Sequence, residues 1–340
     1  MKLGSLKNII SKFSKANILV VGDLILDQYI YGGVDRVSPE APVPVVWARE
    51  RKYSPGGAAN VANNICALGG KVSLCGVIGD RSPEISKRLL NELKDRRIDA
   101  SGVMLENGRE TTLKTRIIAG HQQVVRVDWE HVHNIKRETD NKLRSYISGN
   151  LKDFDAVIVE DYGKGLLDRN LIETIIKEAN RLEKIITIDP KEDNFDCYFK
   201  ATCITPNRKE TENAVRYLKM KDAHNKFKIY KEELLTHNDI IKAGEAILGH
   251  LELESLLITL GENGMWLFEK GKNQHIPTVA QEVFDVSGAG DTVIATFTVA
   301  LACGASKLEA AHIANFAAGI VVGKLGTAVA SRKELSERIR

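Results

Sequence analysis

A run of small residues that ends in a carboxylate is the part of this chain best suited to chemistry. It reads Phe284-Asp285-Val286-Ser287-Gly288-Ala289-Gly290-Asp291-Thr292, and an apolar stretch with helical spacing follows it. Small residues let successive N–H groups point into one space, where the positive end of the following helix attracts anions. We therefore expect the Gly288, Ala289 and Gly290 amides to bind phosphate oxygens. Asp291 would take the proton of a hydroxyl that attacks phosphorus. Alternatively, Asp291 only caps the helix.

Polar residues near the amino end suit a sugar. Asp23 and Asp27 follow an apolar run, and Gly56, Gly57 and Asn60 come after a segment rich in β-branched residues. Carboxylates accept hydroxyl protons, an amide both donates and accepts, and paired glycines let a ligand approach the backbone. The alternative is an ordinary loop at the glycines and a surface helix residue at Asn60.

Several cationic residues suggest that the acceptor already carries an anion. They are Arg36, Lys114, Arg116 and Arg126. The arginine fork matches phosphate oxygens, so a phosphorylated sugar would give these charges a purpose. Taken singly, each is more often a solvated surface residue.

Two further segments suit the nucleotide side of a phosphoryl transfer. Asn207 and Glu210 lie one helical turn apart and could orient the waters of a magnesium ion, although the same spacing makes a helix cap. The Gly-x-x-Gly spacing of Gly261 and Gly264 after Thr259 is typical either of a phosphate-passing turn or of a plain hairpin. The chain contains neither a Walker sequence nor a dinucleotide fingerprint, which disfavours hydride transfer.

The elements that must position these residues are short apolar runs that alternate with helical patterns. This alternation predicts a largely parallel sheet covered by helices on both faces, with ligands at the carboxyl ends of its strands. The runs are 17–21, 72–77, 156–159, 185–188, 203–205 and 256–259. Asp23, Asp161, Asp189, Asn207 and Gly261 each follow one of them.

Two segments lack helical spacing and predict a small accessory sheet. Residues 29–47 and 111–127 are rich in β-branched residues with glycine or proline punctuation. Such a sheet could cover a site and exclude water, and its edge would invite a second copy to pair. Because no composition shift marks a boundary, we expect residues 1–340 to form one domain.

Composition excludes several other classes of protein. A net charge of +3 is too near neutrality to indicate nucleic acid as a partner. The five cysteines lack C-x-x-C spacing, which disfavours metal sites and disulfides. Because no signal peptide or apolar run long enough for a bilayer is present, we expect a cytoplasmic protein without a membrane partner.

With these residues placed, the chain resembles the ribokinase-like (PfkB) carbohydrate kinases. Two family signatures carry the resemblance, at 56–60 and 285–291. Within the family it is similar to the heptose-7-phosphate kinases, whose particular run Ser-Pro-Glu-Ala-Pro-Val-Pro-Val occurs at 38–45. Further matching segments are 21–27, 161–165, 188–191, 205–207 and 321–327.

The resemblance implies a three-layer α/β/α fold with a small lid sheet. It also implies transfer of the ATP γ-phosphate to the C1 hydroxyl of D-glycero-D-manno-heptose 7-phosphate, which gives the β-1,7-bisphosphate used for lipopolysaccharide core heptose. Mg²⁺ would accompany ATP, a monovalent cation is left open, and a homodimer through the lid is expected. The chain contains no His-x-Gly-His motif, so a separate protein is expected to supply the adenylyltransferase step.

The resemblance also assigns roles to residues. Asp291 would be the base, supported by the amides of Gly288, Ala289 and Gly290. The sugar phosphate would contact Asp23, Asp27, Arg36, Gly56, Gly57, Asn60, Lys114, Arg116, Arg126, Asp161 and Lys164. ATP would contact Asn207, Arg208, Lys209, Glu210, Thr259, Gly261, Gly264, Asn315 and Gly319, with Asn207 and Glu210 reaching Mg²⁺ through water.

Two departures and two alternatives accompany the resemblance. Ser287 stands where threonine is common, and Glu160 stands where a small residue is usual, which adds charge near the sugar. One alternative is a kinase for another sugar phosphate or a nucleoside, because fold underdetermines substrate. The other is a catalytically silent sugar-binding regulator, whose usual mark would be loss of the base or of the phosphate-binding turn.

Overall fold

The computed structural model describes residues 3–120, 122–222, 227, 229, 231–280 and 282–339. The strands are β1 (Asn17–Gly22), β2 (Leu24–Val37), β3 (Pro44–Gly57), β4 (Lys71–Gly79), β5 (Asp99–Glu106), β6 (Thr112–Ala119), β7 (Gln122–Trp129), β8 (Ala156–Glu160), β9 (Ile185–Asp189), β10 (Cys203–Ile204), β11 (Ser255–Thr259), β12 (Met265–Glu269) and β13 (Lys272–Ile276). The helices are α1 (Leu3–Ser11), α2 (Ala58–Ala67), α3 (Pro83–Asp95), α4 (Arg137–Asn150), α5 (Arg169–Arg181), α6 (Arg208–Lys221), α7 (His237–His250), α8 (Ala289–Ala302), α9 (Lys307–Val321) and α10 (Arg332–Arg338).

The main sheet confirms the expected α/β architecture. Its described strands lie in the order β13-β12-β11-β10-β9-β8-β1-β4-β5. In this order, each strand from β11 to the far edge at β5 runs parallel to its neighbour, whereas β12 and β13 form an antiparallel edge. All six predicted apolar runs are strands of this sheet. β5 and β13 are not among the predicted apolar runs, because polar or small residues make up the first half of β5 and most of β13. The antiparallel pairing of β11 with β12 matches the hairpin that was one of two interpretations of the turn after Thr259.

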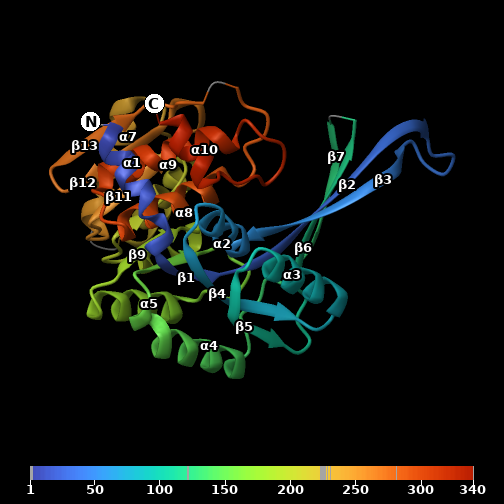
Figure 1. The fold of residues 1–340 in the computed structure, drawn as a ribbon, viewed down its shortest axis with the longest axis horizontal. Coiled ribbons are helices and arrows are strands. Elements are labelled where there is room, and N and C mark those ends of the chain that lie inside the picture. The colour runs from blue at the N-terminus through green and yellow to red at the C-terminus, as the bar shows by residue number, and fades with distance from the viewer. Residues whose placement is uncertain are drawn as a thin grey trace.

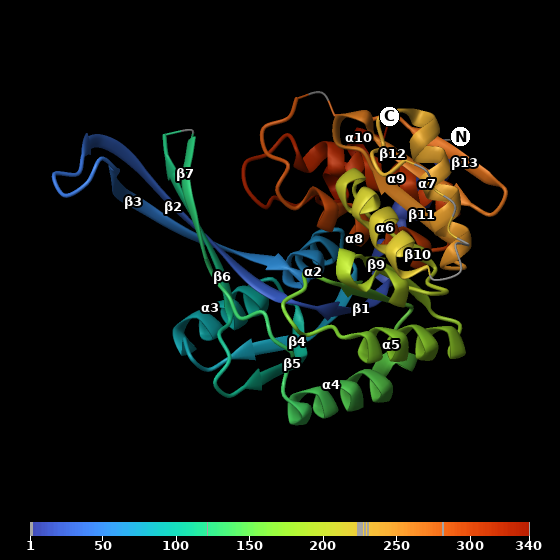
Figure 2. The same cartoon turned by 180° about the vertical axis from the view of Figure 1, so that it is seen from behind.

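Helices cover both faces of this sheet, because its central strands are apolar on both faces. In β1, Ile18 and Val20 join one core with α2, α8 and α9, while Leu19 and Val21 join the other core with α4 and α5. Figures 1 and 2 show the two sets of helices on opposite sides of the sheet. The carboxyl ends of β1, β8, β9 and β11 therefore lie along one edge, next to the start of α8.

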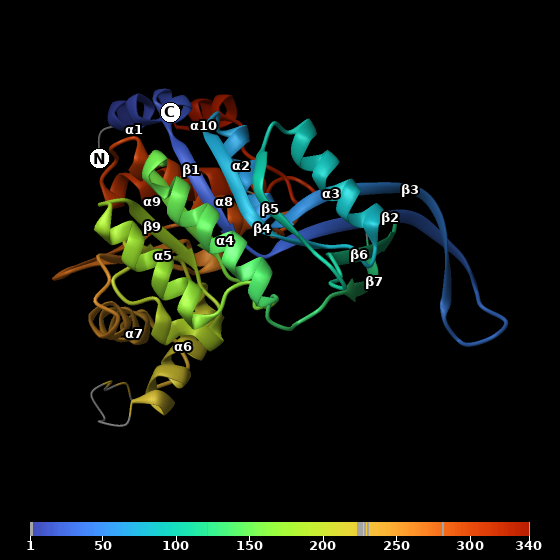
Figure 3. The same ribbon diagram turned by 90° about the horizontal axis from the view of Figure 1, so that it is seen from below.

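The accessory sheet projects from this body, as Figures 1 and 3 show. Its described strands lie in the order β3-β2-β6-β7, and β2 pairs with β6 in parallel. The strands extend beyond the expected segments, because the inner end of β2 is buried in the main core through Leu24 and Leu26. In the part of the chain that the structure describes, no helix is both long and apolar enough to cross a bilayer.

Candidate active site

Asp291 lies in the first turn of α8, and its carboxylate faces two polar side chains. Asn60 Nδ2 donates to Oδ2 at 2.6 Å, and the Tyr162 hydroxyl donates to Oδ1 at 3.1 Å. The residue is only 5% exposed, and burial raises the pKa of Asp291 to about 6, although both hydrogen bonds oppose that rise. The capping alternative is wrong, because Gly288 is the N-cap and no side chain caps it. A buried carboxylate with unused lone pairs can accept a proton.

The backbone ahead of Asp291 presents two amides rather than the three that were expected. Gly288 adopts the left-handed conformation, with φ +75°. The Ala289 amide donates to the carbonyl of Val286 at 3.2 Å, so it is partly occupied within the protein. Among the described residues, no backbone carbonyl accepts from Gly288 or Gly290 N–H. These two amides, at the positive end of α8, are the ones free to bind an anion.

Gly288 allows us to test whether the position of Asn60 matters for turnover. A Cβ at Gly288 would lie 2.7 Å from Asn60 Nδ2, and left-handed backbone costs a non-glycine residue about 1–2 kcal/mol. We expect Gly288→Ala to lower both stability and kcat, measured by urea unfolding and steady-state kinetics. Gly304→Ala is the matched control, since Gly304 has φ +86° and open space around its Cβ position. An equal fall in kcat in both variants would contradict this reasoning.

Asn60 and the two glycines before it form a buried wall beside Asp291. Asn60 is 0% exposed, so the surface alternative for it is wrong. Its Oδ1 is buried and has no hydrogen-bond partner among the described residues, which leaves one acceptor unused. A Cβ at Gly56 would lie 2.4 Å from Asp27 Oδ2, and Gly57 has φ +56°. Only glycine allows the chain to pass this close to Asp27.

The carboxylates of Asp23 and Asp161 both accept hydrogen bonds from other groups of the protein. Asp23 accepts the amides of Tyr162, Lys164 and Leu166 at 3.1, 3.0 and 3.4 Å. Burial raises the pKa of Asp23 to about 6 and also raises the pKa of Asp161.

The Asp161 carboxylate also accepts hydrogen bonds from the protein. Together, Asp23 and Asp161 hold the loop at 162–166 in place. Asp161 accepts hydrogen bonds from Asn194, Tyr198 and the Gly163 amide at 2.8, 2.9 and 3.0 Å. The two carboxylates therefore support the loop that presents Tyr162. Tyr162 lies within the matching segment 161–165, but no role was predicted for it, because nothing in the local sequence indicates which carboxylate its hydroxyl reaches.

Three of the five predicted sugar-side cations are paired with carboxylates. Arg116 is bonded to Asp27, Arg126 contacts Asp128 at 2.9 Å, and Lys164 contacts Glu130 at 2.8 Å. Despite Arg116, burial is the largest influence on Asp27 and raises its pKa.

The two remaining cations lie in very different places. Among the described residues, no carboxylate lies within 4.0 Å of Lys114, whose Nζ is 5.5 Å from the centre of the Tyr162 ring. Burial, and then Lys164, lowers the pKa of Lys114. Arg36 is exposed and stands nine residues beyond Asp27 on β2, or about 30 Å along the strand. The structure therefore brings Lys114 to the site and does not bring Arg36 to the site of the same chain.

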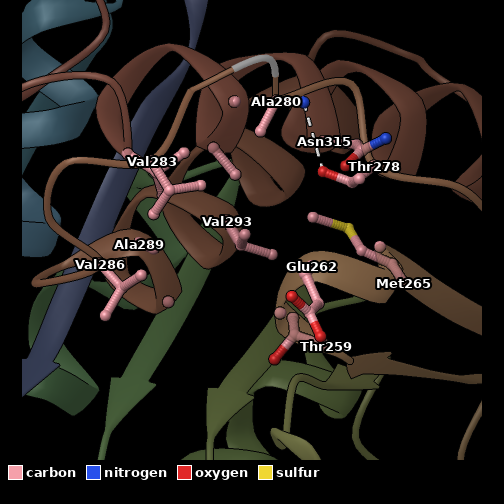
Figure 4. Close-up of a pocket in the computed structure, with 16 residues that line it drawn as sticks. Thr259, Glu262, Met265, Thr278, Ala280, Val283, Val286, Ala289, Val293 and Asn315 are labelled. Carbon is pink, nitrogen blue, oxygen red and sulfur yellow. Dashed lines mark hydrogen bonds between the residues drawn. The ribbon is translucent and has the colours of Figure 1, made fainter.

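A pocket of about 400 Å³ adjoins Ala289 and Gly290 at the start of α8. Figure 4 shows apolar side chains such as Met265 and Val293 pointing into it, with Asn315 and Thr259 at its borders. Five predicted ATP-side residues line it, namely Thr259, Gly261, Gly264, Asn315 and Gly319. Further apolar residues that line it were not predicted, since no local signal distinguishes them from core. They come from β12, the segment before α8, α8 itself, and α9 with the residue that follows it: Met265, Val283, Val286, Val293, Ala318 and Val322. The turn after Thr259 is the antiparallel hairpin of β11 and β12.

The predicted pair Asn207 and Glu210 forms a capping box. Glu210 N–H donates to Asn207 Oδ1 at 2.9 Å, and Asn207 N–H donates to Glu210 Oε2 at 2.8 Å. The backbone of Asn207 nevertheless forms a parallel β-bridge with Thr259, which lines the pocket. Arg208 and Lys209 begin α6 and are not among the residues that line the pocket. The cap therefore explains the spacing of Asn207 and Glu210 without a metal ion.

Comparison with known proteins gives one consistent result. A model of the family described as pfkB family carbohydrate kinase matches residues 15–334. The chain is 44% identical over 319 residues, 94% of its length, to the bifunctional protein HldE of Helicobacter pylori strain J99. It is 43% identical over 337 residues, 98% of its length, to the bifunctional protein HldE of Geotalea uraniireducens. In both cases the chain spans 65% of the relative's length.

Solved structures share the fold at low sequence identity. Phosphofructokinase-2 from Escherichia coli, in complex with substrates and products, has a TM-score of 0.74 and is 17% identical, covering 95% of this chain and 98% of its own. Ribokinase from Arabidopsis thaliana, complexed with ribose and ATP, has a TM-score of 0.71 and is 17% identical, covering 96% and 99%.

Proposed function

The chain belongs to the PfkB family of carbohydrate kinases and is an ATP-dependent sugar kinase, and on that premise we propose that it phosphorylates the C1 hydroxyl of D-glycero-D-manno-heptose 7-phosphate. The observation that carries the proposal is the position of Asp291. It lies between the side chains of Asn60 and Tyr162 on one side and the free amides beside the pocket on the other.

In this mechanism Asp291 accepts the proton of the acceptor hydroxyl while the oxygen bonds to the γ-phosphorus. The bond from that phosphorus to its bridging oxygen breaks, and ADP leaves with the electron pair. The Gly288 and Gly290 amides donate to the transferring phosphoryl group, whose charge they stabilise. The nucleotide base would occupy the apolar pocket that Met265 and Val293 line.

The choice of a phosphorylated acceptor rests on Lys114. It lies over the ring of Tyr162, whose hydroxyl bonds to Asp291, so one tyrosine side chain separates the cation from the base. A sugar with a hydroxyl at one end and a phosphate at the other suits this separation. The heptose assignment itself is supported by the run at 38–45 and by the similarity to the HldE proteins.

A divalent ion is part of the proposal, because ATP carries phosphate charge that must be neutralised. The carboxylates of Glu160 and Asp189 lie close to Asp291 and offer only oxygen ligands, which suits Mg²⁺. When bound, Mg²⁺ would supply positive charge to the phosphate oxygens.

A substrate panel tests the acceptor. ADP release is measured with heptose 7-phosphate, fructose 6-phosphate, ribose and adenosine at equal concentrations. We expect the largest kcat/KM with heptose 7-phosphate. A preference for fructose 6-phosphate or a nucleoside would show that the proposed acceptor is wrong but that the protein is a kinase. No ADP release with any acceptor would favour the catalytically silent regulator.

We also propose that two copies pair through the accessory sheet. The edge strand β7 is exposed along its whole length, and large apolar side chains of this sheet and of the connection between β2 and β3 are exposed. They are Val34, Val37, Val43, Trp47, Val124, Val125, Val127 and Trp129. Burial of such residues by a second copy would remove apolar surface from water. Light scattering should give twice the chain mass for the wild type and a smaller mass for Trp47→Asp. A monomeric wild type would contradict the pairing.

A further inference from the structure

Glu160 ends β8 as a buried carboxylate whose charge the protein leaves unpaired. It is 0% exposed, and neither of its carboxylate oxygens has a hydrogen-bond partner among the described residues. No lysine, arginine or histidine in the described part of the chain forms an ion pair with it. Burial of an isolated charge costs several kcal/mol, so a proton or a cation must compensate it.

Two other carboxylates face Glu160. In the sheet, Asp189 at the end of β9 lies in register with Glu160, and Asp291 approaches from α8. One oxygen of each residue lies within 4.8 Å of the other two. Burial raises the pKa of Glu160 and of Asp189 well above the usual range. Repulsion from Asp189, Asp291 and Glu210 raises the pKa of Glu160 further, and repulsion from Glu210 and Asp291 raises that of Asp189, whereas the contact with Glu160 opposes the rise at Asp189.

We propose that Glu160, Asp189 and Asp291 bind a divalent cation by direct oxygen contacts, even without nucleotide. Around an octahedral magnesium ion, opposite oxygens stand about 4.2 Å apart and adjacent oxygens about 3.0 Å, so the three side chains, whose oxygens lie within 4.8 Å of one another, must move closer together to bind one ion. Glu160 offers both oxygens, whereas Asp291 also accepts from Asn60 and Tyr162. Asp189 is half-buried, whereas Glu160 and Asp291 are buried. The site differs from the water-mediated position first expected at Asn207 and Glu210, since those side chains cap α6.

The experiment uses Mn²⁺ as the probe and the full chain without nucleotide or sugar. After treatment with EDTA and desalting, Mn²⁺ is titrated and the free ion is measured by electron paramagnetic resonance. We expect one saturable site per chain. Glu160→Gln and Asp189→Asn should each weaken it by at least about tenfold, the usual scale for disturbing a metal site.

Glu92→Gln is the matched control. Glu92 is also buried, but Arg88 and Arg96 neutralise it at 2.6 and 2.5 Å, and it lies on α3 away from the cluster. Its Mn²⁺ affinity should equal that of the wild type. As a second readout, Mn²⁺ should raise the Tm of the wild type and of Glu92→Gln but not that of Glu160→Gln. In EDTA, Glu160→Gln should melt no lower than the wild type, because it removes an uncompensated charge.

The proposal is overturned if the wild type shows no saturable Mn²⁺ binding, or if Glu160→Gln binds Mn²⁺ as tightly as the wild type. Either result would mean that a shared proton neutralises Glu160 and Asp189. Should Glu160→Gln fail to fold, Asp189→Asn decides the question by the same comparison. Because no acceptor is present, the result is independent of whether heptose 7-phosphate is the substrate.

Discussion

Replacement of Asp291 by Asn should lower kcat roughly a hundredfold or more, the scale of a positioned general base. Asparagine has nearly the same shape, and the Tyr162 hydroxyl can turn to accept from its amide, so the contacts to Asn60 and Tyr162 can persist. What is lost is the group that takes the proton. Steady-state kinetics would measure the fall in turnover. Nucleotide affinity, measured by calorimetry, should be nearly unchanged, because the pocket-lining residues are intact.

Two further measurements separate loss of the base from damage to the fold. Since burial disfavours the charged form of Asp291, the Asn variant should melt no lower than the wild type. Asp285→Asn is the control. In the wild type the Asp285 carboxylate accepts hydrogen bonds from the Ser287 and Gly326 amides at 2.9 and 3.0 Å, and the oxygen of an asparagine can keep one of these bonds. We expect its kcat to fall by less than about tenfold. Turnover close to wild type in Asp291→Asn would remove that residue from the mechanism.

Lys114→Gln should raise the KM for a phosphorylated acceptor by about tenfold to a hundredfold, with kcat nearly unchanged. A hydrogen bond between an ammonium and a phosphate contributes about 1.5–3 kcal/mol, and Lys114 is the sugar-side cation in the described chain that approaches the site without a carboxylate partner. The KM for the same sugar without its phosphate should change little, which kinetics with both acceptors would measure.

Lys52→Gln is the matched control for Lys114. Lys52 also lies on the accessory sheet over a tyrosine ring, with Nζ 5.4 Å from the centre of Tyr31, but it is exposed. Its replacement should leave both KM values unchanged. Arg116→Ala would be a less informative variant, because it leaves the buried Asp27 without its partner and would disturb the binding of either acceptor. Equal increases in KM for the two acceptors in Lys114→Gln would show that Lys114 does not recognise phosphate.

Local sequence pattern was sufficient to predict the central strands of the main sheet and the glycine-containing turn before α8. Apolar runs such as 17–21 and 156–159 can only be buried strands in a chain that alternates them with helices, so the parallel sheet was predictable from local pattern. The turn at Gly288 was predictable for the same reason, since left-handed backbone before a helix demands glycine.

The tertiary structure alone decided which of these residues meet. Asn60 and Asp291 are 231 positions apart, and only the packing of α2 against α8 brings them into contact. Sheet order places β8 next to β9, which brings Glu160 beside Asp189, and it turns Asp23 and Asp161 toward the loop that carries Tyr162. The length of β2 removes Arg36 from the site. Residue spacing encodes local backbone geometry, whereas the partner of a side chain depends on long-range packing that no short pattern contains.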